Sequence, residues 1–236
     1  MPVRGHSVLC LLALCLPLTC FSAEGVVPYS VGATRLEGHV QSVRELRDAG
    51  VVRQRFDYSC GSAALATLLS YGLGEPVDEA SILSELISPL SGDELVALQK
   101  RGLSLFDLQK YAQGHGYKAQ GFRVPAAQLA KVSRPVIVYI KPGGYDHFAV
   151  LKAVRGGRAY LADPSLGNVR MPLYRFIDMW ADASGRGIVF AVERADGVWP
   201  ERFALQVGGG AAEAEQLATR ELLRIAAPYL EPVRLR

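Results

Sequence analysis

The sequence predicts an α+β fold, in which an N-terminal helical part packs on an antiparallel sheet. The first half of the chain carries apolar residues at helical spacing behind capping residues, over about residues 60–114. The second half changes to short β-rich runs bounded by Gly and Pro, over about residues 117–192. Helices followed by strands indicate an α+β arrangement. Half of the residues are hydrophobic and 21% are charged, which is typical of a globular domain.

The first predicted helix covers residues 60–71 and ends at Gly72. Its apolar residues lie on every side, which indicates a helix buried in the core. Three further helices each begin at a side chain that can cap the free N–H groups of a first turn. They are expected over residues 78–87, 91–102 and 104–114.

The β-rich half predicts five strands and one short helix. The strands are expected over residues 117–124, 136–140, 148–154, 160–162 and 188–192, and the helix over residues 173–180. A turn at Gly156 and Gly157 separates the third strand from the fourth, so these two strands are expected to pair as neighbours.

The N-terminus has the order of a secretory signal. Arg4 precedes an apolar run over residues 8–18, and small residues follow near Ala23. The run is shorter than the roughly 20 residues that span a membrane comfortably. Residues 1–23 are therefore predicted as a signal peptide, and the protein as periplasmic. An uncleaved anchor, or a lipid attached at Cys20, is the alternative use of this segment.

The predicted mature chain divides into three parts. Residues 24–49 form a lead-in segment, residues 50–195 the main domain, and residues 196–236 a C-terminal extension with a helix over residues 211–227. The net charge of +3 is too small to indicate a nucleic-acid partner, and no stable membrane insertion is expected after signal removal. No cofactor is indicated. No metal is expected either, because the mature chain has no closely spaced Cys/His cluster.

Cys60 is the candidate nucleophile. The other three cysteines lie within the first 20 residues, so the predicted mature chain keeps one thiol without a partner. Cys60 begins the buried helix, where the free N–H groups and the helix dipole favour a thiolate. Gly61 is expected to let a substrate backbone come close. The alternative is that Cys60 is a small hydrophobic residue of the core.

A nucleophilic thiol needs a base, and His39, His115 and His147 are the candidates. His39 falls in the lead-in segment, and His115 suits the plain capping of a helix end. His147 opens a strand after a glycine loop, and Asp163 ends the next strand. Antiparallel pairing would bring Asp163 beside His147, where it could orient the ring.

Three alternatives stay open for the residues around this pair. Asp146 is a rival acid, although adjacent strand residues point to opposite faces. Asp163 alone could be a turn residue before a proline. Gln54, six residues before Cys60, could supply an oxyanion donor or could be an ordinary surface residue.

These residues carry a family resemblance. Gln54, the pair Cys60 and Gly61, residues 145–151 (YDHFAVL) and residues 160–164 (YLADP) together resemble the C39 peptidases. Members of this family are papain-like domains that cut bacteriocin leader peptides after a double glycine. The resemblance runs from about residue 50 to residue 193. It implies a papain-like fold with Cys60 as nucleophile, His147 as base, Asp163 as its orienting acid and Gln54 as oxyanion donor.

The chain is also expected to depart from the transporter-borne members of that family, because the sequence shows neither their membrane nor their ATP-binding domain and its N-terminus predicts export. It is similar in size and layout to exported members that accompany functional-amyloid secretion systems. That similarity implies a polypeptide substrate, with amyloid subunits or secretion-system proteins as partners. An acyltransferase with the same thioester chemistry, or a peptide-binding module without turnover, is the alternative. The retained Cys60 favours an enzyme.

Overall fold

The computed structural model describes residues 25–31, 34–40 and 42–207, which fall into two units. The first unit contains an antiparallel hairpin of β1 (Gly25–Val31) and β2 (Thr34–Val40). The second begins at Val43 and contains the candidate site. The predicted signal peptide and the predicted helix over residues 211–227 lie outside the described residues. No helix in the described ranges has the length and apolarity that crossing a bilayer requires.

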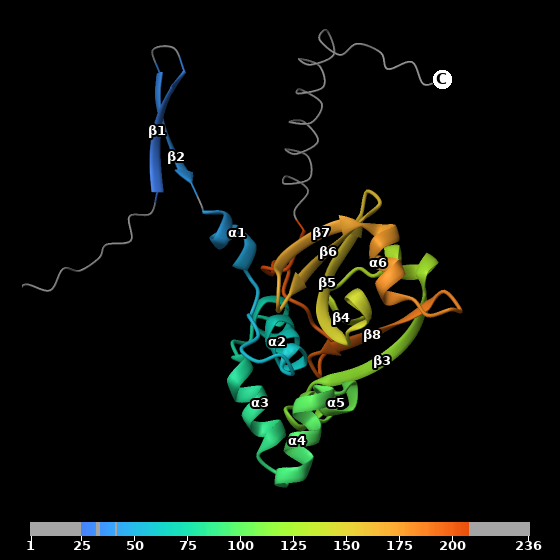
Figure 1. Ribbon diagram of the computed structural model, residues 1–236. Coiled ribbons are helices and arrows are strands. Elements are labelled where there is room, and N and C mark those ends of the chain that lie inside the picture. The colour runs from blue at the N-terminus through green and yellow to red at the C-terminus, as the bar shows by residue number, and fades with distance from the viewer. Residues whose placement is uncertain (1–24, 32–33, 41, 208–236) are drawn as a thin grey trace, which may run out of the picture. The chain divides into compact units, whose positions relative to one another are not determined.

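A six-stranded antiparallel sheet forms the centre of the second unit (Figure 1). Its strands in spatial order are β3 (Lys118–Pro125), β8 (Arg186–Glu193), β4 (Val136–Ile140), β5 (His147–Arg155), β6 (Arg158–Asp163) and β7 (Gly167–Pro172). The β5 and β6 strands are joined through Gly156 and Gly157, both of which have positive φ. The expected pairing of these two strands is therefore present.

The α-helices precede the six-stranded sheet in the chain, apart from α6, which lies between β7 and β8. They are α1 (Val43–Asp48), α2 (Cys60–Thr67), α3 (Glu79–Ile87), α4 (Gly92–Arg101), α5 (Leu105–Gly114) and α6 (Leu173–Trp180). Three short non-α helices are η1 (Leu68–Leu73), η2 (Ala126–Lys131) and η3 (Pro142–Gly144). The predicted α+β order is thus observed.

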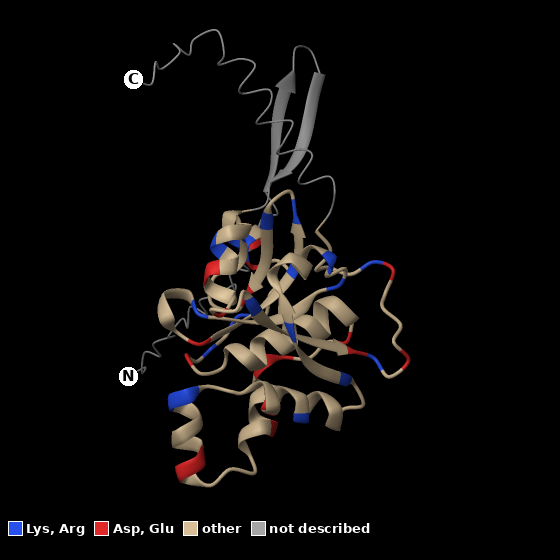
Figure 2. Cartoon of the chain, turned by 90° about the vertical axis from the view of Figure 1, so that its right-hand side faces the viewer, with Lys and Arg blue, Asp and Glu red and all other residues tan. Residues whose placement is uncertain are grey.

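The expected caps are present at the starts of three helices. The carboxylate of Asp78 accepts a hydrogen bond from the Ser81 N–H at 2.7 Å, and Ser91 and Ser104 each form a capping box. The α4 helix also carries acidic residues in its first turn and basic residues in its last, which suits the helix dipole (Figure 2). These local features are why the predicted ranges of α3, α4 and α5 are close to the observed ones.

The two faces of the sheet are covered by different helices, and each covered face has its own core. Alternate residues of β5 separate accordingly: Phe148 and Val150 pack with α2, whereas Ala149 and Leu151 pack with α6. Figure 1 shows α2 and α6 on opposite sides of the sheet. The sheet therefore has buried residues on both faces, and its strand ends are where a cleft can open.

The buried helix is longer than the sequence predicts. After α2 the chain continues without a break through the π-helical η1 to Leu73, and Gly74 ends it with a φ of 75°. The prediction that Gly72 ends the helix is wrong. Gly72 instead packs against the side chains of Leu68 and Trp199, where a larger residue would be crowded.

The sequence does not predict the β1–β2 hairpin, α1, β7 or the short helices η2 and η3. Residues 196–207 also pack on the domain, since Leu205 is buried in the same core as α2 and its N–H donates to the Tyr71 carbonyl. Neither α1 nor β7 carries a strong periodic pattern, and both are held by contacts with distant parts of the chain.

Candidate active site

A cleft of about 1010 Å³ is lined by Cys60, His147, Asp163 and Gln54. Its walls come from the loop before α2, the corner between α4 and α5, and the loop over residues 142–147. All four residues that the sequence singled out therefore lie in one cavity. They come from segments far apart in the chain, which the fold brings together.

Packing sets the position of Cys60. It is the first residue of α2, where every residue is buried, and its own exposed fraction is 6%. A Cβ added to Gly61 would lie 3.2 Å from the Leu103 side chain and 3.3 Å from Phe148. Gly61 therefore serves close packing of the core, and the expectation that it makes room for a substrate backbone is wrong.

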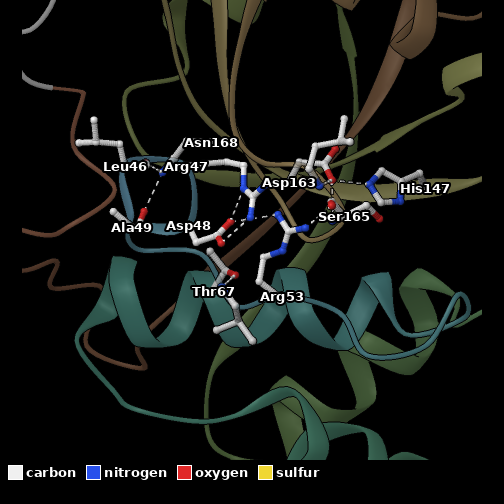
Figure 3. Close-up of polar contacts among 12 residues, drawn as sticks. Leu46, Arg47, Asp48, Ala49, Arg53, Thr67, His147, Asp163, Ser165 and Asn168 are labelled. Atoms are coloured by element: carbon white, nitrogen blue, oxygen red, sulfur yellow. Dashed lines mark hydrogen bonds and ion pairs between the residues drawn. The ribbon is translucent and has the colours of Figure 1, made fainter. Parts of the chain in front are cut away.

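The imidazole of His147 contacts the carboxylate of Asp163. The distance from His147 Nε2 to Asp163 Oδ1 is 3.1 Å, and both side chains are largely buried (Figure 3). His147 is the first residue of β5 and Asp163 the last of β6, so the antiparallel pairing of these strands brings the two together.

The charged form of His147 is favoured. Burial by itself lowers the pKa of His147, but hydrogen bonds to Asp163 and Cys60, together with the charges of these groups, outweigh it and raise the pKa to about 9. At neutral pH the ring is therefore an imidazolium held between the Asp163 carboxylate and the Cys60 sulfur. Asp163 occupies Nε2, which leaves Nδ1 as the ring nitrogen for the thiol.

Asp163 is ionised and fixed by its own turn. Burial acts to raise its pKa, but the hydrogen bond and charge of His147 and the backbone N–H groups of Leu166 and Ser165 together lower it. The N–H of Ser165 donates to Asp163 Oδ1 at 2.8 Å, and that of Leu166 at 3.0 Å. The carboxylate is thus both the acceptor for His147 and the organiser of a turn.

Gln54 is bound to the same turn. Its backbone N–H donates to the Pro164 carbonyl at 3.1 Å, and its Oε1 accepts from the Ser165 hydroxyl at 2.7 Å. Its Nε2 donates to the Phe56 carbonyl at 3.0 Å, close before Cys60 in the chain. Gln54 therefore links the segment that leads to Cys60 with the turn that holds Asp163.

A strap formed by residues 46–54 holds this turn from outside (Figure 3). The guanidinium of Arg53 donates to the Ser165 carbonyl and lies 3.3 Å from Asp48. The Asn168 amide donates to the carbonyls of Leu46, at 3.1 Å, and Ala49, at 2.7 Å. The part of the predicted lead-in segment that precedes residue 50 thus contacts the turn that carries a candidate site residue.

The strap lies so close to the turn after Asp163 that position 167 must be a glycine. Gly167 has a φ of 85°, and a Cβ there would lie 2.5 Å from the Arg47 carbonyl oxygen. For the turn after Asp163, the sequence offered one indication, because an Asp side chain often accepts a hydrogen bond from the backbone N–H two residues later. It offered none for the partners supplied by the strap.

Glu79 is a buried carboxylate that sequence reasoning missed. Its exposed fraction is 2%, and its Oε1 accepts from the Arg55 N–H at 2.9 Å and from the hydroxyl of Ser59. Ser59 directly precedes Cys60. The second oxygen of Glu79 is buried without a hydrogen-bond partner among the described residues, and lies 3.7 Å from Arg55 Nε. An acid in the first turn of α3 is expected for the helix dipole, so the sequence does not distinguish this role.

The rival residues have other partners. Asp146 accepts from the Tyr139 hydroxyl and pairs with Lys141 at 3.3 Å, away from the His147 ring. His115 lies at the end of α5, with its Nδ1 2.9 Å from the Tyr111 carbonyl oxygen and its Nε2 3.3 Å from Glu85. His39 belongs to β2 in the other unit.

Comparison with known protein families shows which family the chain belongs to. The family model of the Peptidase C39 family matches residues 48–184, which is more than half of the 236 residues. The chain belongs to the C39 peptidase family. The match confirms the predicted family and enzyme class, so this C39 peptidase is a cysteine peptidase, and its α+β order agrees with the predicted fold class.

Two Pseudomonas relatives are similar over most of their length. A Pseudomonas aeruginosa protein described as a probable functional amyloid protease, FapD, is 39% identical over 181 residues, which is 77% of this chain and 76% of that protein. A Pseudomonas fluorescens protein with the same description is 33% identical over 187 residues, which is 79% of each chain.

Solved structures with a similar arrangement include the peptidase domain of Streptococcus ComA. It has a TM-score of 0.49 and 20% identity, and the match covers 61% of this chain and 97% of that domain. A double glycine motif protease from an AMS/PCAT transporter, in complex with a leader peptide, has a TM-score of 0.44 and 25% identity. That match covers 62% of this chain and 94% of the other.

Proposed function

We propose that this C39 peptidase is exported to the periplasm and cleaves a secreted polypeptide there through an acyl-enzyme on Cys60. One observation carries the proposed roles: the His147 ring contacts Asp163 at 3.1 Å, and both Asp163 and Cys60 raise its pKa. A buried imidazole that holds the cysteine proton between the sulfur and a carboxylate is the arrangement that activates a cysteine nucleophile.

In the first step, the proton of Cys60 is held on Nδ1 of the His147 imidazolium, and the Cys60 sulfur attacks the carbonyl carbon of the scissile peptide bond as a thiolate. Asp163 keeps the ring oriented and stabilises its positive charge. The carbonyl oxygen becomes an oxyanion. Gln54 uses one amide N–H for Phe56, and its second N–H is the proposed donor to that oxyanion.

In the second step, the C–N bond breaks and His147 returns its proton to the leaving amine, which leaves a thioester on Cys60. Water then attacks the thioester, and His147 acts as its base. The product acid leaves and the thiol is restored. Both steps need the same ring to hold and release one proton, which is the reason for a positioned imidazole beside the thiol.

The proposed substrate is a functional-amyloid component or a partner in its secretion. The names of the two Pseudomonas relatives, which are similar over more than three quarters of this chain, support this proposal. The secretory order of residues 1–23 supports export. A periplasmic peptidase would meet such a polypeptide on its way out of the cell.

The experiment compares cells that carry the wild-type gene with cells that carry Cys60→Ser. New N-termini in periplasmic and secreted proteins are identified by mass spectrometry in both. The proposal expects a small set of termini that is present in the wild-type cells and lost in the Cys60→Ser cells, and it expects the precursor to come from the amyloid system. Identical termini in the two strains would contradict the peptidase role of Cys60, whereas termini in unrelated proteins would contradict only the substrate.

A further inference from the structure

The cleft that contains Cys60 and His147 also has an apolar part, which the proposed reaction steps do not use. Four side chains without charge line it: Ile140, Leu161, Met171 and Met179. Ile140 and Leu161 are buried, whereas Met171 and Met179 are half-buried. They come from β4, β6, β7 and α6. We name these four side chains the apolar recess.

The apolar recess lies on the His147 side of the cleft. Ile140 is the direct cross-strand partner of His147, so the two side chains leave the same face of the sheet. Leu161 is two residues before Asp163 on β6 and shares its face in the same way. This is the face that packs with α6, whereas Cys60 begins the helix on the opposite face.

Apart from His147 and Asp163, which pair with each other, the polar side chains of the loop beside the apolar recess are exposed. Asp146 and Tyr145 also line the cleft, and both are exposed. The Asp146 carboxylate is already engaged by Lys141 at 3.3 Å and by the Tyr139 hydroxyl. A charged substrate side chain placed in the recess would lose its water without gaining a partner. The two methionines can adapt to apolar side chains of different shape.

The chemistry decides which part of the substrate meets this recess. His147 returns its proton to the leaving amine, so the residue that supplies that amine must lie beside the His147 ring. Its side chain is then next to Ile140 and Leu161 rather than next to Cys60. We infer that the apolar recess is the subsite for the first residue after the scissile bond, and that it selects a large apolar side chain there. This inference rests on the proposed function.

The test uses the full mature chain and a peptide mixture in which the residue after the cleaved bond varies. Product termini identify the cleaved bonds, and Cys60→Ser shows which cleavages depend on the thiol. The expected result is a preference of about tenfold or more for Leu, Met or Phe over Gly, Asp or Lys at that position. Thiol-dependent cleavage without this preference would overturn the subsite and leave the proposed function intact. Absence of thiol-dependent cleavage would overturn both.

Substitutions that fill the recess sharpen the test. Met171→Phe and Met179→Phe should each shift the preference from large apolar residues towards Ala and Gly. Ile177→Phe is the matched control, because Ile177 packs in the same core from the same helix as Met179 but does not line the cleft. An equal shift in Ile177→Phe, or no shift in either Met variant while both remain folded and active, would contradict the inference.

Discussion

The two groups that meet in the cleft are held in place by different means. Cys60 begins a helix with every residue buried, so the volume of its neighbours sets its position. His147 is held by a chain of polar contacts, from Asp163 through Ser165 to Gln54 and Arg53. The position of the proposed nucleophile therefore depends on packing, whereas that of the proposed base depends on hydrogen bonds supplied by a strap and a turn.

The largest effect is expected when the carboxylate that holds the His147 ring is removed. Asp163→Asn removes the charge that stabilises the imidazolium, so kcat/KM for peptide cleavage should fall by about 10²- to 10⁴-fold. Asp146→Asn is the control, because this neighbouring carboxylate binds Tyr139 and Lys141 instead. Equal losses in the two variants would show that Asp163 has no special role.

The pH dependence of activity should follow the titration of His147. The pKa of His147 is raised to about 9, so kcat/KM should fall as the pH rises through about 9, where the ring loses the proton it must give to the leaving amine. The same raised pKa stabilises the fold below about pH 6.5, and this contribution is lost as the pH rises through about 9. In Asp163→Asn both transitions should move to lower pH. An alkaline limit that does not move would exclude His147 as its source.

The sequence predicts those parts of the fold that depend on neighbours in the chain. Caps at Asp78, Ser91 and Ser104 are local, and the helices behind them begin where expected. The strands from residue 136 to residue 162 follow from apolar runs and one glycine turn. Helix α1 and strand β7 were missed because the contacts that hold them, such as those of Asn168 with Leu46 and Ala49, join distant segments.

The candidate site divides in the same way. Cys60, His147 and Asp163 could be found from the sequence because a lone thiol, a histidine that opens a strand and an acid that ends the next strand form a recognisable catalytic pattern. Glu79 and Ser165 were not, because an acid at a helix start and a serine in a turn are common for local reasons. Their importance here comes from burial and from partners that only the folded chain brings together.

A polar contact also exists on the nucleophile side, and breaking it should have a medium effect. Glu79→Ala leaves the Arg55 N–H and the Ser59 hydroxyl without their buried acceptor, which should cost about 1–3 kcal/mol of unfolding free energy. Glu79→Gln keeps one acceptor oxygen and should lose less. Urea unfolding gives the stability, and kcat measured on the folded variants shows whether Cys60 is displaced. An unchanged unfolding free energy in Glu79→Ala would mean that packing alone fixes the loop before Cys60.

The smallest effect tests the packing side by adding one methyl group. Gly61→Ala should lower the unfolding free energy by only about 1 kcal/mol. Crowding of Leu103, Leu108 and Phe148 at 3.2–3.3 Å costs about 1–3 kcal/mol, and the helix propensity of Ala offsets up to about 1 kcal/mol of that cost. Gly92→Ala is the matched control in α4, where no atom lies within 4 Å of the added carbon. The control should gain about 0.5 kcal/mol from helix propensity. If both variants gain stability in thermal unfolding, Cys60 is not held by tight packing.

The rate of Cys60 alkylation reports whether His147 activates Cys60. Iodoacetamide is added at about pH 6, where an ordinary thiol is almost fully protonated and reacts slowly, and the adduct is followed by intact-protein mass spectrometry. The wild-type mature chain should be labelled at Cys60 at least about tenfold faster than His147→Ala, and Cys60→Ser should not be labelled. Equal rates for wild type and His147→Ala would contradict the activation of Cys60 by His147.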